Sequence, residues 1–198
     1  MNDGPISLDS LARDIVARSG YRFTIAGDEA ARDVAYRLRY STIADRGWQQ
    51  YAECRNGRDC DEWDPGAVHV VGWDGDTPFA TGRLVLPGVT LPTELACGIV
   101  VEPRGEVIDV GRMTVARSHQ GPGHAGFVAL LARLYLEVRA RGFLFACGVM
   151  SPRARSVLRL LGLSVELLGP DRPHWGEPRA PVRFAVLVDT ASLSGRWR

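Results

Sequence analysis

Lysine is absent from the sequence: all 24 basic residues are arginine, and they stand against 23 acidic residues. A lysine imine, a phosphate-binding lysine of the P-loop type and a lysine general base are therefore excluded. One explanation for the use of arginine in place of lysine is a coding bias toward GC-rich codons. The other explanation is that the protein uses planar, permanently charged groups that pair with carboxylates or phosphates. Because the formal net charge is only +1, binding to nucleic acid through bulk positive charge is disfavoured.

Metal-binding and targeting patterns are missing as well. The four cysteines form no C-x-x-C pair and stand at no metal-ligand spacing from the four histidines. No basic-then-apolar leader and no apolar run of membrane-spanning length is present. We therefore expect a cytoplasmic protein with reduced cysteines, no metal site and no membrane span. Its 198 residues are expected to form one domain, 1–198.

Hydrophobic periodicity predicts an α/β chain. Helices are expected over residues 7–19, 28–45 and 152–161, and between Gly123 and Gly142. Strands are expected over residues 21–26, 68–73, 79–86, 107–115, 143–149, 165–168 and 184–188. Residues 49–66 are interpreted as a surface loop and residues 87–105 as an irregular connection. The strand–helix–strand unit over 107–149 implies a mixed sheet.

A glycine-rich loop joins the strand over 107–115 to the clearest helix, and residues 120–125 of it read Gln-Gly-Pro-Gly-His-Ala. Free N–H groups at the start of a helix bind anions, and glycines let a ligand approach closely. The loop fits the pattern Q/R-x-x-G-x-G/A and so resembles the acyl-CoA loop of the GNAT N-acyltransferase superfamily; a plain glycine-rich turn is the alternative. The resemblance implies a set of donor-binding residues: Met113, Thr114, Val115, Gln120, Gly121, Gly123 and Ala125.

Four charged segments accompany this loop. Residues 38–48 contain Leu38-Arg39 and Trp48, and residues 61–64 read Asp-Glu-Trp-Asp. Arg83 lies on the strand over 79–86, and residues 109–112 read Asp-Val-Gly-Arg on the next strand. In order and approximate spacing, these segments resemble the acyl-homoserine-lactone synthase family and the related N-acyl amino acid synthases, which are branches of the GNAT fold. The resemblance covers most of the chain.

The resemblance implies both a fold and a site. The fold is α/β, with a GNAT-like mixed, mostly antiparallel central sheet, a splayed and bulged strand, and flanking helices in a single acyltransferase domain. The site is a nearly neutral charge network that shapes an amino-acceptor pocket together with Trp48. The expected members of this network are Arg39, Arg83, Arg112, Asp61, Asp64 and Asp109. For any single pair, an exposed salt bridge of small value is the alternative.

Asp109 and Arg112 share a face of their strand only if the strand is irregular, because residues three apart on a regular strand point to opposite faces. One extra residue in a bulge brings them together, and Gly111 is a plausible place for it. GNAT-like enzymes carry such a bulge here. It would free backbone N–H groups that polarise the carbonyl of a thioester.

The implied activity is transfer of an acyl group from a thioester to an amine. Asp109 or a water relay would take the proton of the amine, Glu106 is the second candidate base, and Arg112 completes the catalytic set. The acyl chain would lie in an apolar slot between the splayed strands. That slot would be lined by residues such as Phe145 and Cys147, for which a place in the core is the simpler explanation.

Three positions depart from the synthase pattern: Ile43 stands where Phe is typical, Asp109 where Glu is usual, and Gly111 where Ser is common. The acceptor therefore stays open between S-adenosylmethionine, which would connect the chain to quorum sensing, and a free amino acid. The donor stays open between acyl-CoA and acyl carrier protein, the latter being a candidate protein partner. Two other classes also stay open: an ordinary GNAT acetyltransferase using acetyl-CoA on a small amine, and a catalytically silent thioester-binding module.

Overall fold

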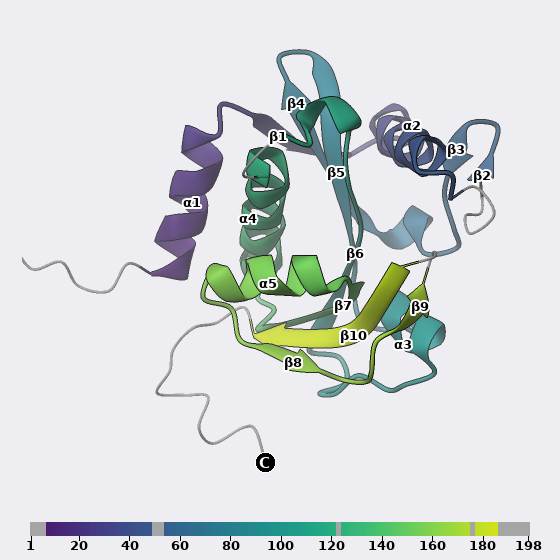
Figure 1. The fold of residues 1–198 in the computed structure, drawn as a ribbon, viewed down its shortest axis with the longest axis vertical. Helices are drawn as coiled ribbons and strands as arrows, with labels where there is room; N and C mark the ends of the chain where they lie inside the picture. Colours follow the sequence, from purple (N-terminus) through teal and green to yellow (C-terminus); the bar gives the residue numbers. More distant parts are fainter. Residues whose placement is uncertain (1–6, 49–53, 122–123, 175–176, 186–198) are drawn as a thin grey trace, which may run out of the picture.

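The computed structural model describes residues 7–48, 54–121, 124–174 and 177–185 (Figure 1). An eight-stranded sheet runs in the order β1–β4–β5–β6–β7–β10–β8, with β9 pairing with β10 off this path. Neighbouring strands are antiparallel except β6 and β7, which are parallel. The predicted class, a mixed and mostly antiparallel sheet with flanking helices, is confirmed.

The helices and strands have the following bounds. The helices are α1 (Leu8–Arg18), α2 (Glu29–Asp45), α3 (Pro92–Cys97), α4 (Ala125–Ala140) and α5 (Pro152–Leu160). The strands of the sheet are β1 (Arg22–Ile25), β4 (Val68–Asp74), β5 (Thr77–Val85), β6 (Val107–Val115), β7 (Phe145–Met150), β8 (Val165–Leu167), β9 (Arg172–His174) and β10 (Glu177–Ala185). A separate hairpin is formed by β2 (Cys54–Arg55) and β3 (Arg58–Asp59), and two short 3₁₀ turns are η2 (Asp64–Gly66) and η3 (Arg117–His119).

The helices cover both faces of the sheet. In Figure 1, α1 and α4 lie side by side on one face, and α2 lies on the other with the β2–β3 hairpin. Side chains of the apolar stripe of α4, among them Leu130 and Leu134, are buried in one core with Leu84 of β5 and Ile108 of β6. The buried side chains beside α3 form a second, smaller core. Each face of the sheet therefore has its own hydrophobic cluster.

Strands β6 and β7 pair only over a short stretch. Val107–Asp109 are opposite Phe145–Cys147, after which β6 continues to Val115 and β7 to Met150 without further register pairs between them. At the point of separation the backbones are close: a Cβ added to Gly148 would lie 2.5 Å from the carbonyl oxygen of Val110. The splayed strand predicted from the sequence is confirmed.

The predicted bulge in β6 is confirmed as well, one residue later than Gly111. Arg83 pairs with Gly111 and Thr81 pairs with Thr114, so two residues of β6 lie opposite the single residue between them on β5. The first of these two, Arg112, has a left-handed backbone with φ of 50°. A non-glycine residue adopts this conformation only where other contacts hold it.

Two segments are more ordered than the sequence predicted. The expected loop over 49–66 contains the β2–β3 hairpin and η2, and the expected irregular connection over 87–105 contains α3. Helix α3 begins with Pro92 at its first position, and the Glu94 carboxylate accepts a hydrogen bond from the backbone N–H of Leu91 at 2.9 Å. The C-terminal strand begins earlier than predicted, at Glu177, and residues 186–188 of the predicted strand lie outside the described residues.

Candidate active site

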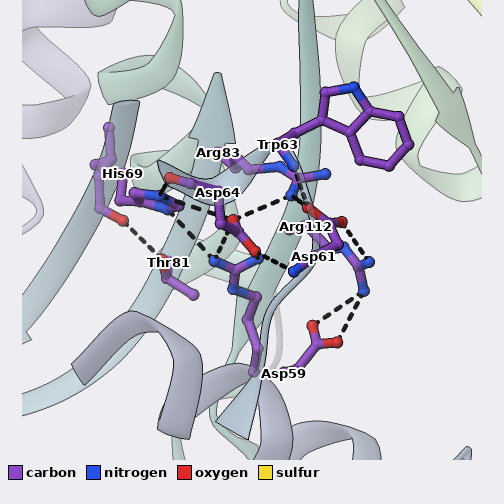
Figure 2. A network of polar contacts seen from close by, with 10 residues as sticks. Asp59, Asp61, Trp63, Asp64, His69, Thr81, Arg83 and Arg112 are labelled. Atoms are coloured by element: carbon purple, nitrogen blue, oxygen red, sulfur yellow. Dashed lines mark hydrogen bonds and ion pairs between the residues drawn. The ribbon is translucent and has the colours of Figure 1, made fainter. Parts of the chain in front are cut away.

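A buried network of alternating charges joins α2 and the β2–β3 hairpin to the central strands (Figure 2). Its cations are Arg39 of α2, Arg83 of β5 and Arg112 of β6; its anions are Asp59 of β3, Asp61 in the following turn and Asp64 of η2. Five of these side chains are at most 3% exposed, and Arg112 is 18% exposed. Three charges of each sign balance, which is the condition for burying such a set.

Asp64 is the centre of the network. Its Oδ1 accepts hydrogen bonds from Arg39 Nη2 at 2.9 Å and from Arg83 Nη1 at 3.0 Å. Its Oδ2 accepts from the backbone N–H of Asp61 at 2.8 Å. Burial alone would raise the pKa of Asp64, but the two arginines hold that pKa below its ordinary value. Asp64 therefore remains a carboxylate that fixes the positions of two guanidinium groups.

Asp61 connects Arg83 to Arg112. One carboxylate oxygen accepts from Arg83 Nη1 at 2.5 Å, and the other accepts from Arg112 Nη2 at 2.7 Å. Arg112 Nη1 also donates to both oxygens of Asp59, each at 3.0 Å. Burial raises the pKa of Asp59, and the charge of Arg112 opposes this shift. Arg112 is thus held by two carboxylates at the bulge of β6.

Two members of this site, Asp59 and His69, were not predicted from the sequence. Asp59 belongs to the β2–β3 hairpin, in a segment that was expected to be a loop. No predicted helix or strand therefore placed Asp59 opposite Arg112. His69 of β4 is fully buried; its Nδ1 accepts from Arg39 Nη2 at 3.3 Å, and its Nε2–H donates to the backbone carbonyl of Asp64 at 3.0 Å. Burial lowers the pKa of His69, so the ring is neutral. His69 is one of four consecutive buried residues on β4, so no polar–apolar alternation in the sequence indicates it.

Two donors of the network have no partner. Among the residues that the structure describes, Arg39 Nε and Arg83 Nε are buried without a hydrogen-bond acceptor. An unpaired buried donor costs about 1–3 kcal/mol, so such groups are expected to be satisfied by water or by a bound ligand. The network is balanced in charge but is not saturated in hydrogen bonds.

The structure places Asp109 outside the charge network, contrary to the expectation from the sequence. Its side chain is 2% exposed and points under α3, where Oδ2 accepts from the backbone N–H of Thr93 at 2.8 Å and from Cys147 Sγ at 3.6 Å. Burial raises the pKa of Asp109. Asp59 takes the position expected for Asp109 in the network, because the β2–β3 hairpin carries Asp59 directly to Arg112.

The space beside Asp109 is open over Gly111. A Cβ added to Gly111 would have a single heavy-atom neighbour within 4 Å, which is Asp109 Oδ1 at 3.5 Å. The two residues lie on the same face of β6, two positions apart, and Arg83 pairs with Gly111 across the strands. The carboxylate, the open position and the network therefore adjoin one another on this face of the sheet.

Other predicted site residues have different surroundings. Glu106 is exposed and precedes β6. Trp48 is half-buried and stacks with Arg46 and Arg179, whose guanidinium carbons lie 4.7 and 5.7 Å from the indole ring. Phe145 and Cys147 are buried in the smaller core beside α3, which is the simpler of the two explanations given for them; their part in an acyl slot stays a prediction. Their side of β7 is filled by α3, and the same burial raises the pKa of the Cys147 thiol.

The predicted donor loop is described in part. Gln120 follows η3, and its Nε2 donates to the backbone carbonyl of Val115 at 2.6 Å. Gly121 is exposed, Gly123 lies outside the described residues, and Ala125 begins α4. The side chain of the residue before Ala125 makes no capping hydrogen bond to α4. Met113 and Thr114 are half-buried on the bulged part of β6 and Val115 is buried.

The described residues show neither a membrane-spanning helix nor a metal centre. No helix in that part of the chain is both long enough and apolar enough to cross a membrane. No group of three or more His, Cys, Asp or Glu side chains there is arranged to hold a metal ion. Cys60, Cys97 and Cys147 are free thiols.

No protein-family model and no curated protein sequence matches the chain. Solved structures do match: "Crystal Structure of the AHL Synthase LasI" aligns over 84% of this chain and 90% of its own, with a TM-score of 0.70 at 15% identity. The chain has the fold of acyl-homoserine-lactone synthases. The CoA-dependent synthase BjaI, solved with SAM and isopentyl-CoA, aligns over 80% of this chain and 77% of its own, with a TM-score of 0.66 at 18% identity. FeeM, an N-acyl amino acid synthase from uncultured soil microbes, aligns over 83% of this chain and 89% of its own, with a TM-score of 0.59 at 16% identity.

The likeness to these acyltransferases confirms the fold that the sequence motifs implied.

Proposed function

We propose that this protein is an N-acyltransferase that moves an acyl group from a thioester to the amine of a small, amino-acid-like acceptor. The observation that carries the proposal is the separation of β6 from β7 directly after Asp109 and Cys147, beside a buried and charge-balanced arginine network. Structures of similar fold include a synthase holding SAM and isopentyl-CoA and an N-acyl amino acid synthase. Both chemistries need a thioester and an amine to meet at one point.

The donor would lie along the bulged half of β6. There, Met113–Val115 have left the pairing with β7, and unpaired strand edges present backbone groups to a ligand. A pantetheine arm carries amide groups that can bond to such an edge. The pyrophosphate of an acyl-CoA would lie at the start of α4, beside Gln120 and Gly121, where N–H groups without a side-chain cap attract anions. An acyl carrier protein presents the same arm and is the alternative donor.

The acceptor would lie on the face of the network. Arg112 is the most exposed of its six charged members, and the unpaired Nε groups of Arg39 and Arg83 are donors that an acceptor carboxylate or a bridging water would satisfy. Both acceptors considered from the sequence, S-adenosylmethionine and a free amino acid, carry a carboxylate beside the reacting amine. A quorum-sensing role would follow if the acceptor is S-adenosylmethionine.

The reaction would proceed by attack of the neutral amine on the thioester carbonyl. The new C–N bond forms, the C–S bond breaks, and the thiol leaves with one proton. Asp109, reached over the open position at Gly111, would take the proton of the amine directly or through water. Burial raises the pKa of Asp109, which is the change that a carboxylate needs to serve as a base. Backbone N–H groups at the bulge would stabilise the oxyanion.

The test is a matrix of purified protein with acyl-CoA and acyl-carrier-protein donors against S-adenosylmethionine and free amino acids. Mass spectrometry of the products is expected to find an N-acyl amino acid or an N-acyl lactone, with release of one thiol for each product. Equal or better use of acetyl-CoA on simple amines would instead indicate an ordinary acetyltransferase. Binding of donor without any N-acyl product would indicate a silent thioester-binding module, and the proposal would be wrong. Because free acyl-CoA and carrier proteins are intracellular, we place the activity in the cytoplasm.

A further inference from the structure

Helix α3 covers the side of Asp109 that faces away from the open position at Gly111. Asp109 Oδ1 lies 3.5 Å from where a Cβ of Gly111 would stand, whereas Oδ2 accepts from the backbone N–H of Thr93 at 2.8 Å. Thr93 is 1% exposed and Asp109 is 2% exposed, so α3 excludes water from this carboxylate. The position of α3 therefore determines how far Asp109 is removed from solvent.

Helix α3 is too short to hold this position by itself. It has six residues, and a helix of that length is not stable through its own hydrogen bonds. The Glu94 carboxylate closes the segment on itself, accepting from the N–H groups of Leu91 and Val101, each at 2.9 Å. Leu91 and Val101 also pack in the smaller core with Val107. Contacts with other parts of the chain must fix α3 over Asp109.

Trp63 supplies such a contact from the charge network. Its indole Nε1 donates to the backbone carbonyl of Thr90, just before α3, at 2.8 Å, and its side chain packs against the smaller core. Its backbone N–H donates to Asp61 Oδ1 at 3.1 Å, the oxygen that also accepts from Arg83. Figure 2 shows Trp63 beside Arg83, whose guanidinium carbon lies 5.9 Å from the centre of the indole ring. Trp63 thus contacts the network through its backbone and the α3 segment through its side chain.

Other groups also face Asp109. They are Arg83 of β5, the Cys147 thiol of β7 and, on α3, Thr93 and Cys97. Burial raises the pKa of Asp109, and the hydrogen bonds from Thr93 and the charge of Arg83 oppose this shift. Displacement of α3 would remove the hydrogen bonds and part of the burial together. Because burial is the larger effect, we expect the pKa of Asp109 to fall toward its ordinary value when α3 moves away.

We propose that Trp63 is a positioning residue that holds α3 over Asp109 and so keeps water away from the proposed base. The inference rests on the proposed N-acyl transfer and adds to it a residue that acts through α3. A carboxylate removed from water is a stronger base than a hydrated one, because loss of water disfavours the charged form. The charge network on the acceptor side would in this way control the strength of the base on β6.

The first test measures the pH profile of kcat for Trp63→Ala, Trp63→Phe and a matched control, Trp73→Ala. Trp73 is also half-buried, and its Nε1 donates to Thr24 Oγ1 at 2.9 Å, at the far end of β4 from the network. In Trp63→Ala, kcat is expected to fall by about threefold to tenfold, the effect of one hydrogen bond, with KM for the acceptor changed less than about twofold. The acidic limb of its profile is expected to move to lower pH. Trp63→Phe, which keeps a ring against the core, is expected between Trp63→Ala and the wild type, and Trp73→Ala keeps the wild-type limb.

A second test follows the position of α3 without any transfer assay. Cys147 is fully buried under α3, so iodoacetamide reaches its thiol only when the segment opens. Peptide mass spectrometry is expected to find labelling of Cys147 about threefold to tenfold faster in Trp63→Ala than in the wild type, and unchanged in Trp73→Ala. Urea unfolding shows whether each variant is folded and how much of the faster labelling follows from global unfolding.

The outcomes separate the inference from a purely structural role. A folded and active Trp63→Ala protein with an unchanged acidic limb would overturn the inference, as would unchanged labelling of Cys147. A gain in labelling that equals the loss of global stability would also overturn it, because Trp63 would then be only a core residue. If Trp63→Ala does not fold, Trp63→Phe is judged by the same criteria. If the wild type transfers no acyl group, the proposed function fails, and the labelling of Cys147 still decides whether Trp63 holds α3.

Discussion

Arg112 combines a left-handed backbone at the bulge of β6, with φ of 50°, with a guanidinium that donates to both carboxylate oxygens of Asp59 at 3.0 Å. A non-glycine residue in this region of φ carries a cost of about 1–3 kcal/mol, which persists only where surrounding contacts compensate it. The ion pairs of Arg112 with Asp59 and Asp61 are such contacts. The hairpin that carries Asp59 therefore stabilises the bulge, and with it the separation of the strands on which the proposed donor site depends.

Substitution Asp59→Asn tests this connection. One of the two carboxylates that hold Arg112 loses its charge, so kcat/KM for N-acyl transfer is expected to fall because Arg112 holds the bulge less firmly. Asp33→Asn is the matched control: Asp33 pairs with Arg37 and Arg58 on the surface, where such pairs contribute about 0–1 kcal/mol. Equal effects of the two substitutions on kcat/KM would contradict the role given to Asp59.

Gly148→Ala is expected to disturb the point at which β6 and β7 separate. The added Cβ would lie 2.5 Å from the carbonyl oxygen of Val110, and a backbone atom cannot move aside as a side chain can. We expect a loss of about 1–3 kcal/mol in the free energy of unfolding, the usual effect of overpacking, and a lower rate with long-chain donors. Gly27→Ala makes the same change with no heavy atom within 4 Å and should leave both quantities unchanged. Wild-type stability and rates in Gly148→Ala would show that the strands can separate further than the close approach of Gly148 to Val110 indicates.

His69 predicts a pH dependence of stability. Burial lowers its pKa in the folded protein below the ordinary value of 6.5, so the unfolded chain binds a proton more readily than the folded chain. The stability that neutral His69 provides is complete above about pH 6.5 and is lost as the pH falls below that value, at up to about 1.4 kcal/mol per pH unit. His69→Gln, which keeps a donor and an acceptor, is expected to flatten this dependence. Urea unfolding gives the free energy of unfolding of both proteins from neutral to mildly acidic pH. The difference between the two proteins at each pH removes the contribution of the titrating groups that they share. Parallel curves would show that the pKa of His69 does not change on unfolding.

The sequence predicted the fold well because the signals that define the sheet are local. The apolar stripe of α4, the long strand over 107–115 and the glycine after each helix are visible without tertiary information. The bulge was expected from the resemblance to GNAT-like enzymes, although Asp109, which it was expected to bring together with Arg112, lies outside the network. The charged partners of Arg112 were predicted wrongly, because Asp59 takes the place expected for Asp109. Asp59 is carried to Arg112 by a hairpin whose strands have two residues each, which is too short and too polar to show periodicity in the sequence. His69 was missed because a buried histidine on an apolar strand becomes informative only when Arg39 is seen against its ring.

Asp109 provides the sharpest test of the proposed mechanism, because its two roles predict different results for Asp109→Asn. As an anchor for α3, the side chain needs only an oxygen that accepts from Thr93 N–H, which asparagine retains. As the base, it needs the charge, and kcat is expected to fall by about 10²–10⁴-fold. Burial raises the pKa of Asp109, so its charge opposes folding increasingly as the pH rises above about 3.8, and at neutral pH Asp109→Asn should be at least as stable as the wild type. A stable Asp109→Asn protein that keeps kcat within about threefold would leave Asp109 an anchor alone. A loss found only in Glu106→Gln would move the base to Glu106.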